Sequence, residues 1–304
     1  MSYTEFSELI LEALEAIIPE GIQIKLITTE KINNCIRKGV VFEQKEVNYA
    51  PVIYLEPFYE VFRQGHTVEA VAEEVYRCFI EDTGAVGEEV DEFISFEKAK
   101  KNIFAKIIHI EENKKMLEKI PHWIYLDFAI IPYFEVQNDH IYRGSIQINH
   151  EHMKFWRLDK DTLLEWAITN TKQSKETLFC PMADLMMGLF DEDDTEAVRC
   201  ASHDFYVLTN KEKFLGAVQV CFPEVVKDIH FILGCSFFLL PSSIHEWIIV
   251  PENCTFKADT LWDTVQHVNK YGVQDEEILS GNIYYYSAIS QKIQIYDVGN
   301  VKND

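Results

Sequence analysis

The first third of the chain switches between the hydrophobic period of a helix and that of a strand. From residue 6 to residue 18 apolar side chains recur at helical spacing, and Ser2 and Glu5 precede them with the spacing of a capping box. Residues 22–26 then alternate apolar and polar, which predicts a half-buried strand. Further strands are predicted at residues 39–42 and 52–55, and a second helix over residues 68–79.

The middle of the chain contains its longest apolar run. Residues 123–136 are predicted as one long strand, and the alternation at 146–148 predicts its hairpin partner. The acidic, glycine-containing residues 81–92 are typical of a surface loop or hinge. We also predict a short helix at 95–101, a strand at 103–110, a charged helix ending at Lys119, a helix capped by Asp159 or Asp161, and a helix after Pro181.

The C-terminal third alternates strands with helices. We predict strands at 205–208, 236–240 and 246–250, a helix over 217–233 interrupted near Pro223, a helix from Thr260 to Gly272, and a hairpin of 283–286 with 292–296. This alternation indicates an α/β or α+β fold, with mixed sheets on which helices pack. At 304 residues the chain is long enough for two domains, which we place at residues 1–105 (α+β) and 106–304 (α/β).

Charge narrows the range of partners. The chain has 28 Lys and Arg against 50 Asp and Glu, so its formal net charge is −22. A surface of this sign repels phosphate backbones and anionic lipid heads, so we expect no direct binding to nucleic acid or membranes. It is compatible with a basic protein partner, including a nuclease groove that the protein would occupy in place of nucleic acid. Plain solubility is the simpler explanation of the same charge.

The cysteines indicate a reducing compartment. Seven are present, at positions 35, 78, 180, 200, 221, 235 and 254, widely spaced and without a C-x-x-C pair. This pattern is typical of reduced cytosolic thiols rather than of disulfides or a zinc site. The N-terminus lacks the basic region of a secretory signal, and no apolar stretch reaches membrane-spanning length, so we expect a cytoplasmic protein.

One segment places catalytic residue types close together. Motifs for nucleotide binding, zinc peptidases, serine hydrolases and kinases are missing from the sequence. Residues 240–246, however, contain Ser242, Ser243, His245 and Glu246 just past a predicted buried strand. A hydrolase site of the Ser/His/Glu type is one interpretation. The other is a structural turn, because neighbours on an extended chain point to opposite faces and the serines readily bond local backbone.

A second segment contains two histidines. His150 and His152 would share one face of a strand, and they would bind a metal if further ligands such as His203, Asp204 or Glu246 converged on them. The alternative is a polar junction between a strand and a helix. We expect neither a metal nor any other cofactor.

Several segments resemble a known family. Residues 205–210 (FYVLTN) and 240–246 (LPSSIHE), together with residues 51–55, 277–280 and 284–286, resemble an uncharacterised domain-of-unknown-function family of gut Firmicutes. From about residue 120 onward the chain is also faintly similar to a second unknown-function Firmicutes family. The resemblance implies no activity, and it transfers no catalytic role. Asn210, which ends the first segment, and His203, which precedes it, are candidate ligand-binding residues.

Two functions of different classes remain open. The first is a non-enzymatic binding or regulatory protein that recognises a protein or a small ligand, with an acidic inhibitor of a basic nucleic-acid-binding enzyme as a special case. The second is a hydrolase with a Ser/His/Glu or metal-assisted site near residues 242–246. The missing motifs favour the first, and the sequence leaves the oligomeric state open.

Overall fold

The computed structural model describes residues 1–44, 52–83, 92–136, 144–186 and 204–298. The chain divides into two compact units. We call residues 1–102 with 134–146 the N-terminal unit, and residues 103–133 with 147–304 the C-terminal unit. His203, Cys200 and the acidic run at 191–196 lie outside the described residues.

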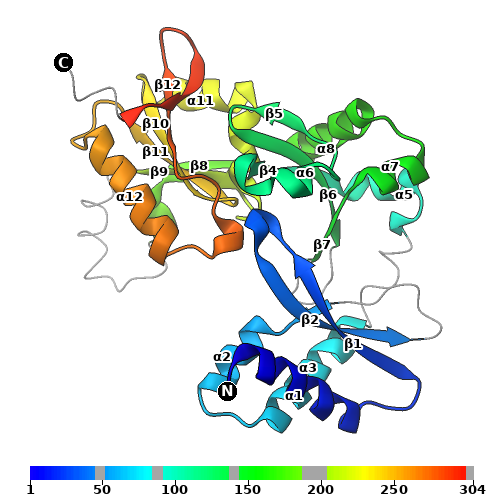
Figure 1. Cartoon of the computed structure of the whole chain (residues 1–304). Helices are drawn as coiled ribbons and strands as arrows, with labels where there is room; N and C mark the ends of the chain where they lie inside the picture. Colours follow the sequence, from blue (N-terminus) through cyan, green and yellow to red (C-terminus); the bar gives the residue numbers. More distant parts are fainter. Residues whose placement is uncertain (45–51, 84–91, 137–143, 187–203, 299–304) are drawn as a thin grey trace. The chain divides into compact units, whose positions relative to one another are not determined.

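The N-terminal unit combines an antiparallel sheet with helices (Figure 1). Its elements are α1 (Tyr3–Ile17), β1 (Ile22–Glu30), β2 (Ile36–Gln44), β3 (Val52–Tyr54), α2 (Glu56–Arg63), α3 (Val68–Thr83) and α5 (Phe96–Ala99). Ser2 and Glu5 form the predicted capping box at the start of α1. Phe42 of β2 stacks on Phe79 of α3 at 4.2 Å between ring centroids, within a core to which α1 contributes Phe6. Helix α2 was not predicted from the sequence.

The C-terminal unit is built on a sheet of strand order β13-β12-β10-β11-β9-β8. Its strands are β8 (Thr177–Pro181), β9 (Tyr206–Asn210), β10 (Phe237–Ser243), β11 (Glu246–Pro251), β12 (Ile283–Ser287) and β13 (Lys292–Tyr296). Every pair in this order is antiparallel. The fold class is therefore α+β, which is one of the two classes that the sequence predicted.

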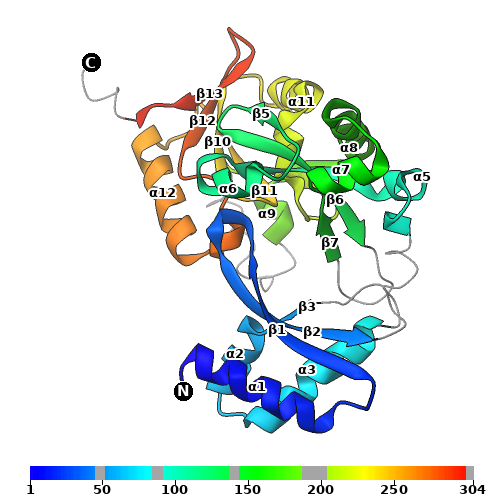
Figure 2. The same ribbon diagram turned by 45° about the vertical axis from the view of Figure 1, so that its right-hand side comes forward.

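The two faces of this sheet are covered by different elements. On one face, helix α12 (Ala258–Tyr271) packs Leu261 and Val265 against Phe238 and Ile283. The opposite face receives the 3-10 helix η4 (Gly216–Cys221) and helix α11 (Pro223–Leu233), as Figure 2 shows. Trp247 of β11 lies on that second face and donates its indole N–H to the carbonyl of Ala217 at 2.8 Å.

A second sheet of the structure has the order β4-β6-β5, with β7 paired to β6. The strands are β4 (Ile103–His109), β5 (Trp123–Tyr125), β6 (Phe128–Val136) and β7 (Gly144–Gln147), and the nearby helices are α6 (Lys114–Leu117), α7 (His150–Trp156) and α8 (Lys160–Ser174). Asp159 caps α8 as predicted, since its carboxylate accepts from Thr162 N. Asn170 and Thr171 of α8 bond to the backbone of β4, which joins the helix to the strand.

Three sequence predictions change in detail. The run 123–136 is two antiparallel strands rather than one, because Leu126 adopts a left-handed φ of 55° and turns the chain at Asp127. Residues 177–181 form strand β8, and the predicted helix after Pro181 follows as α9 (Met182–Met186). Residues 240–243 belong to strand β10 and do not lie past its end. Independent folding of domains 1–105 and 106–304 stays a prediction.

Candidate functional site

The segment 240–246 forms the end of a β-hairpin. Ser242 and Ser243 are the last residues of β10, and Glu246 is the first residue of β11. Ser242 donates from Oγ to Glu246 Oε1 at 3.2 Å, and His245 donates its backbone N–H to Ser243 Oγ at 3.0 Å. The ladder between the strands shifts register between Pro241 and Ser243. Both serines therefore bond within the turn, which is the structural alternative that the sequence left open.

The imidazole of His245 holds a neighbouring loop. Its Nδ1 accepts the backbone N–H of Leu215 at 2.9 Å, and its Nε2 lies 3.4 Å from Glu277 Oε1. The first contact uses the nitrogen lone pair that a general base would need, so the proton sits on Nε2 and faces Glu277. Neither serine is hydrogen-bonded to the imidazole. These residues are close in sequence, but the structure does not align their side chains as a catalytic triad.

Asn210 supports the same loop from the end of β9. Its Nδ2 donates to the carbonyl of Phe214 at 2.8 Å, and its Oδ1 accepts the Phe214 N–H at 3.2 Å. Gly216 lies two residues after Phe214, and a Cβ there would lie 2.6 Å from Asn210 N and 2.8 Å from His245 O. Only glycine fits this close approach. Asn210 and His245 therefore cooperate in fixing residues 211–216, whereas His203 lies outside the described residues.

His150 and His152 occupy the first turn of α7 rather than a strand. Residues i and i+2 of a helix are about 200° apart, so the two imidazoles do not share a face. His152 Nδ1 instead accepts the N–H of Asn149 and completes a cap for this helix. Among the described residues no group of three or more metal-ligating side chains converges.

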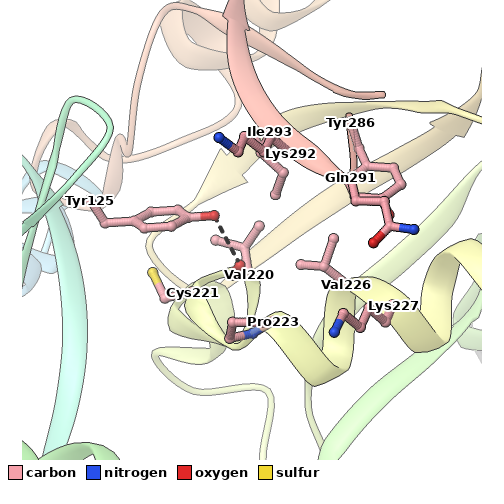
Figure 3. A pocket seen from close by; sticks show the side chains of 10 residues that line it. All are labelled: Tyr125, Val220, Cys221, Pro223, Val226, Lys227, Tyr286, Gln291, Lys292 and Ile293. Atoms are coloured by element: carbon pink, nitrogen blue, oxygen red, sulfur yellow. Dashed lines mark hydrogen bonds between the residues drawn. The ribbon is translucent and has the colours of Figure 1, made fainter. Parts of the chain in front are cut away.

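A pocket of about 240 Å³ lies elsewhere in the C-terminal unit (Figure 3). It is lined by residues of β5, η4, α11, β12 and the start of β13 and is open to solvent. The lining residues are Tyr125, Val220, Cys221, Pro223, Val226, Lys227, Tyr286, Gln291, Lys292 and Ile293. Its volume is below the usual 300–1,000 Å³ of drug-sized sites, so the pocket suits a small molecule.

The pocket has an apolar floor and a polar rim. Tyr286, Val220 and Val226 are buried beneath it, with exposed fractions of 1%, 2% and 6%. Gln291 and the two lysines are exposed at its edge. The ring of Tyr286 stacks on Phe237 at 4.7 Å between centroids, which fixes the floor in place.

Two weakly acidic groups in the pocket, the Cys221 thiol and the Tyr125 phenol, stay protonated. Burial raises the pKa of the Cys221 thiol above its ordinary value, and it does the same for the Tyr125 phenol. The Tyr125 hydroxyl donates to the carbonyl of Val220 at 3.4 Å. A thiol that is not ionised is a poor nucleophile, so these groups line the pocket as neutral surfaces.

Asp127 ties together two walls of this pocket. It follows Tyr125 by two residues in the turn between β5 and β6. Its carboxylate accepts the Tyr284 hydroxyl at 2.8 Å and the Asn282 amide at 2.9 Å, and His109 Nε2 lies 3.5 Å away. Tyr284 precedes the pocket residue Tyr286 by two positions on β12, so both lie on one face of that strand. The two tyrosine walls are therefore joined through one carboxylate, which we call the Asp127 clamp.

The clamp favours the ionised carboxylate. Burial would raise the pKa of Asp127, but the hydrogen bonds from His109, Tyr284 and Asn282 outweigh it and hold that pKa below its usual range. The Tyr284 phenol is affected in the opposite direction, because burial first and the Asp127 charge second raise its pKa. The proton thus stays on the phenol and is donated to Asp127.

None of the pocket or clamp residues was a candidate from the sequence. The pocket residues alone come from segments up to 168 positions apart, from Tyr125 to Ile293, and no local spacing links them. The one available signal was Asp127 itself. Aspartate is rare in strands, so an aspartate in the middle of an apolar run indicates a turn. Its carboxylate would also need polar partners there.

These features describe an α+β protein with a small open pocket and a hydrogen-bonded clamp behind it. The chain belongs to a family of unknown function, DUF5688, which it matches over residues 3–288. No curated protein and no solved structure matches the chain. The occurrence of this family in gut Firmicutes stays a prediction. None of the described helices is long and apolar enough to cross a membrane.

The lowered pKa of Asp127 predicts a pH-dependent stability. Because the folded-state pKa lies below the unfolded value of about 3.9, the clamp stabilises the fold fully above that value and loses its contribution as pH falls through the folded-state pKa. We expect Asp127→Asn to lower the free energy of unfolding by about 1–3 kcal/mol at pH 7. Urea denaturation of both proteins between pH 3 and pH 7 measures this difference. It should shrink below about pH 4, and a difference that stays constant down to pH 3 would contradict the assignment.

Proposed function

We propose that this protein is a non-enzymatic binding protein that holds a small organic molecule in the pocket of Figure 3. The observation that carries the proposal is the buried apolar floor beneath an open polar rim. Such a site gains affinity from apolar burial and orientation from a few polar groups. The clamp supports the proposal, because a wall fixed before binding loses little conformational entropy when the ligand arrives.

The protonation states in the pocket favour binding over catalysis. A neutral thiol and a neutral phenol offer neither a thiolate nucleophile nor a ready base. The hydrolase alternative, which centres on residues 242–246, would require His245 to release the Leu215 N–H before it accepted a proton from a serine. That exchange costs a buried backbone hydrogen bond. The cytoplasmic location of the protein stays a prediction.

A neutral aromatic probe tests the pocket directly. We expect 2-naphthamide to bind with a dissociation constant on the order of 1 mM or tighter, as about 0.3 kcal/mol per heavy atom predicts. The variant Ile293→Trp places a bulky ring in the pocket. Because the probe then loses apolar contacts, its binding should weaken by roughly tenfold or more. Isothermal titration calorimetry and ligand-observed NMR measure both values.

The matched control is Gln294→Trp. Residue 294 is exposed and follows Ile293 on the edge strand β13, but it does not line the pocket. This variant should bind the probe as the natural protein does. If both tryptophan variants bind equally well, the probe sits elsewhere and the proposed site is wrong.

A second function follows from the acidic face of α1. Its glutamates at positions 5, 8, 12 and 15 are exposed and lie within about 80° of one another around the helix, opposite the buried Phe6 and Leu14. The helix carries no Lys or Arg. A row of negative charge of this kind supports binding to a basic protein, including inhibition of a nucleic-acid-binding enzyme by charge mimicry.

Neutralising this row tests the second function. The triple variant of Glu8, Glu12 and Glu15 to Gln should lose salt-sensitive capture of a basic partner from host lysate, with Glu5 kept for its role in the cap. A variant with Glu165, Asp228 and Asp263 changed to their amides removes the same charge from the C-terminal unit and should retain capture. Equal loss in both variants would show a dependence on net charge alone and would exclude α1 as the contact.

A further inference from the structure

We infer that the ligand of the pocket is a carboxylate with a flat apolar body, and this inference rests on the proposed binding function. Two features point to this class: the cationic side chains Lys227 and Lys292, which lie on opposite sides of the pocket in Figure 3, and the aromatic rings Tyr125 and Tyr286 of its lining. The apolar body would lie on the floor, and its charged group would remain at the opening between the lysines.

The lysines are available to a ligand. Both are exposed, and neither forms an ion pair with a carboxylate of the described residues. The acid that precedes Lys227 by one helical turn is Glu224, and Lys172 of α8 engages it at 2.7 Å. The pKa of the Glu224 carboxyl is lowered first by the Lys172 hydrogen bond and last by the charge of Lys227, so Lys172 is the main partner of Glu224.

The position of these charges is unusual for this chain. With 50 acidic residues against 28 basic ones, an average stretch of surface is negative. At the pocket the rim instead carries two ammonium groups and the Gln291 amide, as Figure 3 shows. At physiological ionic strength fields decay within about 8 Å, so a bound anion responds to these near cations more than to the distant acids.

The body of the ligand is inferred from the floor. Tyr286 is held flat by its stack on Phe237, and Tyr125 is fixed through its hydroxyl to Val220. Aromatic walls of this kind favour planar groups over branched ones. The pocket of about 240 Å³ leaves little room beyond one such body and one charged group. Two exposed lysines without a glycine-rich loop suit a single carboxylate better than a polyphosphate.

The test compares two probes that share one body. The probe 2-naphthoate carries a carboxylate where 2-naphthamide carries a neutral amide. At fixed ionic strength and pH 7, calorimetric titration of the natural protein should give a dissociation constant for 2-naphthoate that is lower on the order of tenfold. Two ion pairs at a partly exposed rim are expected to produce an effect of this size.

Charge removal at the rim identifies the cause. The variant Lys227→Gln with Lys292→Gln should bind both probes with equal affinity, because the carboxylate has lost its partners. The matched control, Lys115→Gln with Lys257→Gln, removes the same charge at exposed positions that do not line the pocket. It should keep the preference for 2-naphthoate. Thermal unfolding of each variant checks that the fold is retained.

The outcomes separate this inference from the proposed function. Equal binding of the two probes to the natural protein would overturn the carboxylate assignment and leave the pocket as a binding site. A preference that survives in the Lys227 and Lys292 variant would also overturn it, since the lysines would not be its source. If neither probe binds, both the inference and the proposed function fail.

Discussion

The carboxylate of Asp127 is the interaction on which the pocket region depends. It joins the β5–β6 turn to strand β12 across 157 positions of sequence through the Tyr284 hydroxyl. A partly buried ionised carboxylate is unfavourable unless donors surround it, and here Tyr284 and Asn282 supply them. Aromatic packing joins the same segments. The ring of Phe128, next to Asp127, packs on the rings of Trp247 and Tyr284 at 5.7 and 5.3 Å between centroids.

The clamp has a direct consequence for the pocket. Tyr125 and Tyr286 each lie two residues from a clamp residue, and both line the pocket. A change at Asp127 would therefore displace a wall without touching the ligand. Elsewhere on the same sheet, His245 and Asn210 hold residues 211–216 by hydrogen bonds to backbone groups. Both the Asp127 clamp and these hydrogen bonds hold a turn or loop against the six-stranded sheet.

The sequence predicted the helices and strands better than the tertiary contacts between them. Periodicity identified α1, α12 and the C-terminal hairpin, because each buries one face along its own length. It missed the turn at Asp127, since the apolar residues on both sides continue the strand pattern. The candidate site at 240–246 gathered reactive residue types that the structure uses for a hairpin. The pocket depends on pairing between distant strands, which no local pattern encodes.

The most direct measurement is a double-mutant cycle on the clamp. The free energy of unfolding would be determined for the natural protein, Asp127→Ala, Tyr284→Phe and the double variant at pH 7. We predict a coupling energy of about 1–3 kcal/mol, as expected for a partly buried hydrogen bond to a charged group. A coupling energy near zero would mean that the two residues contribute independently, and it would contradict the central role given to Asp127.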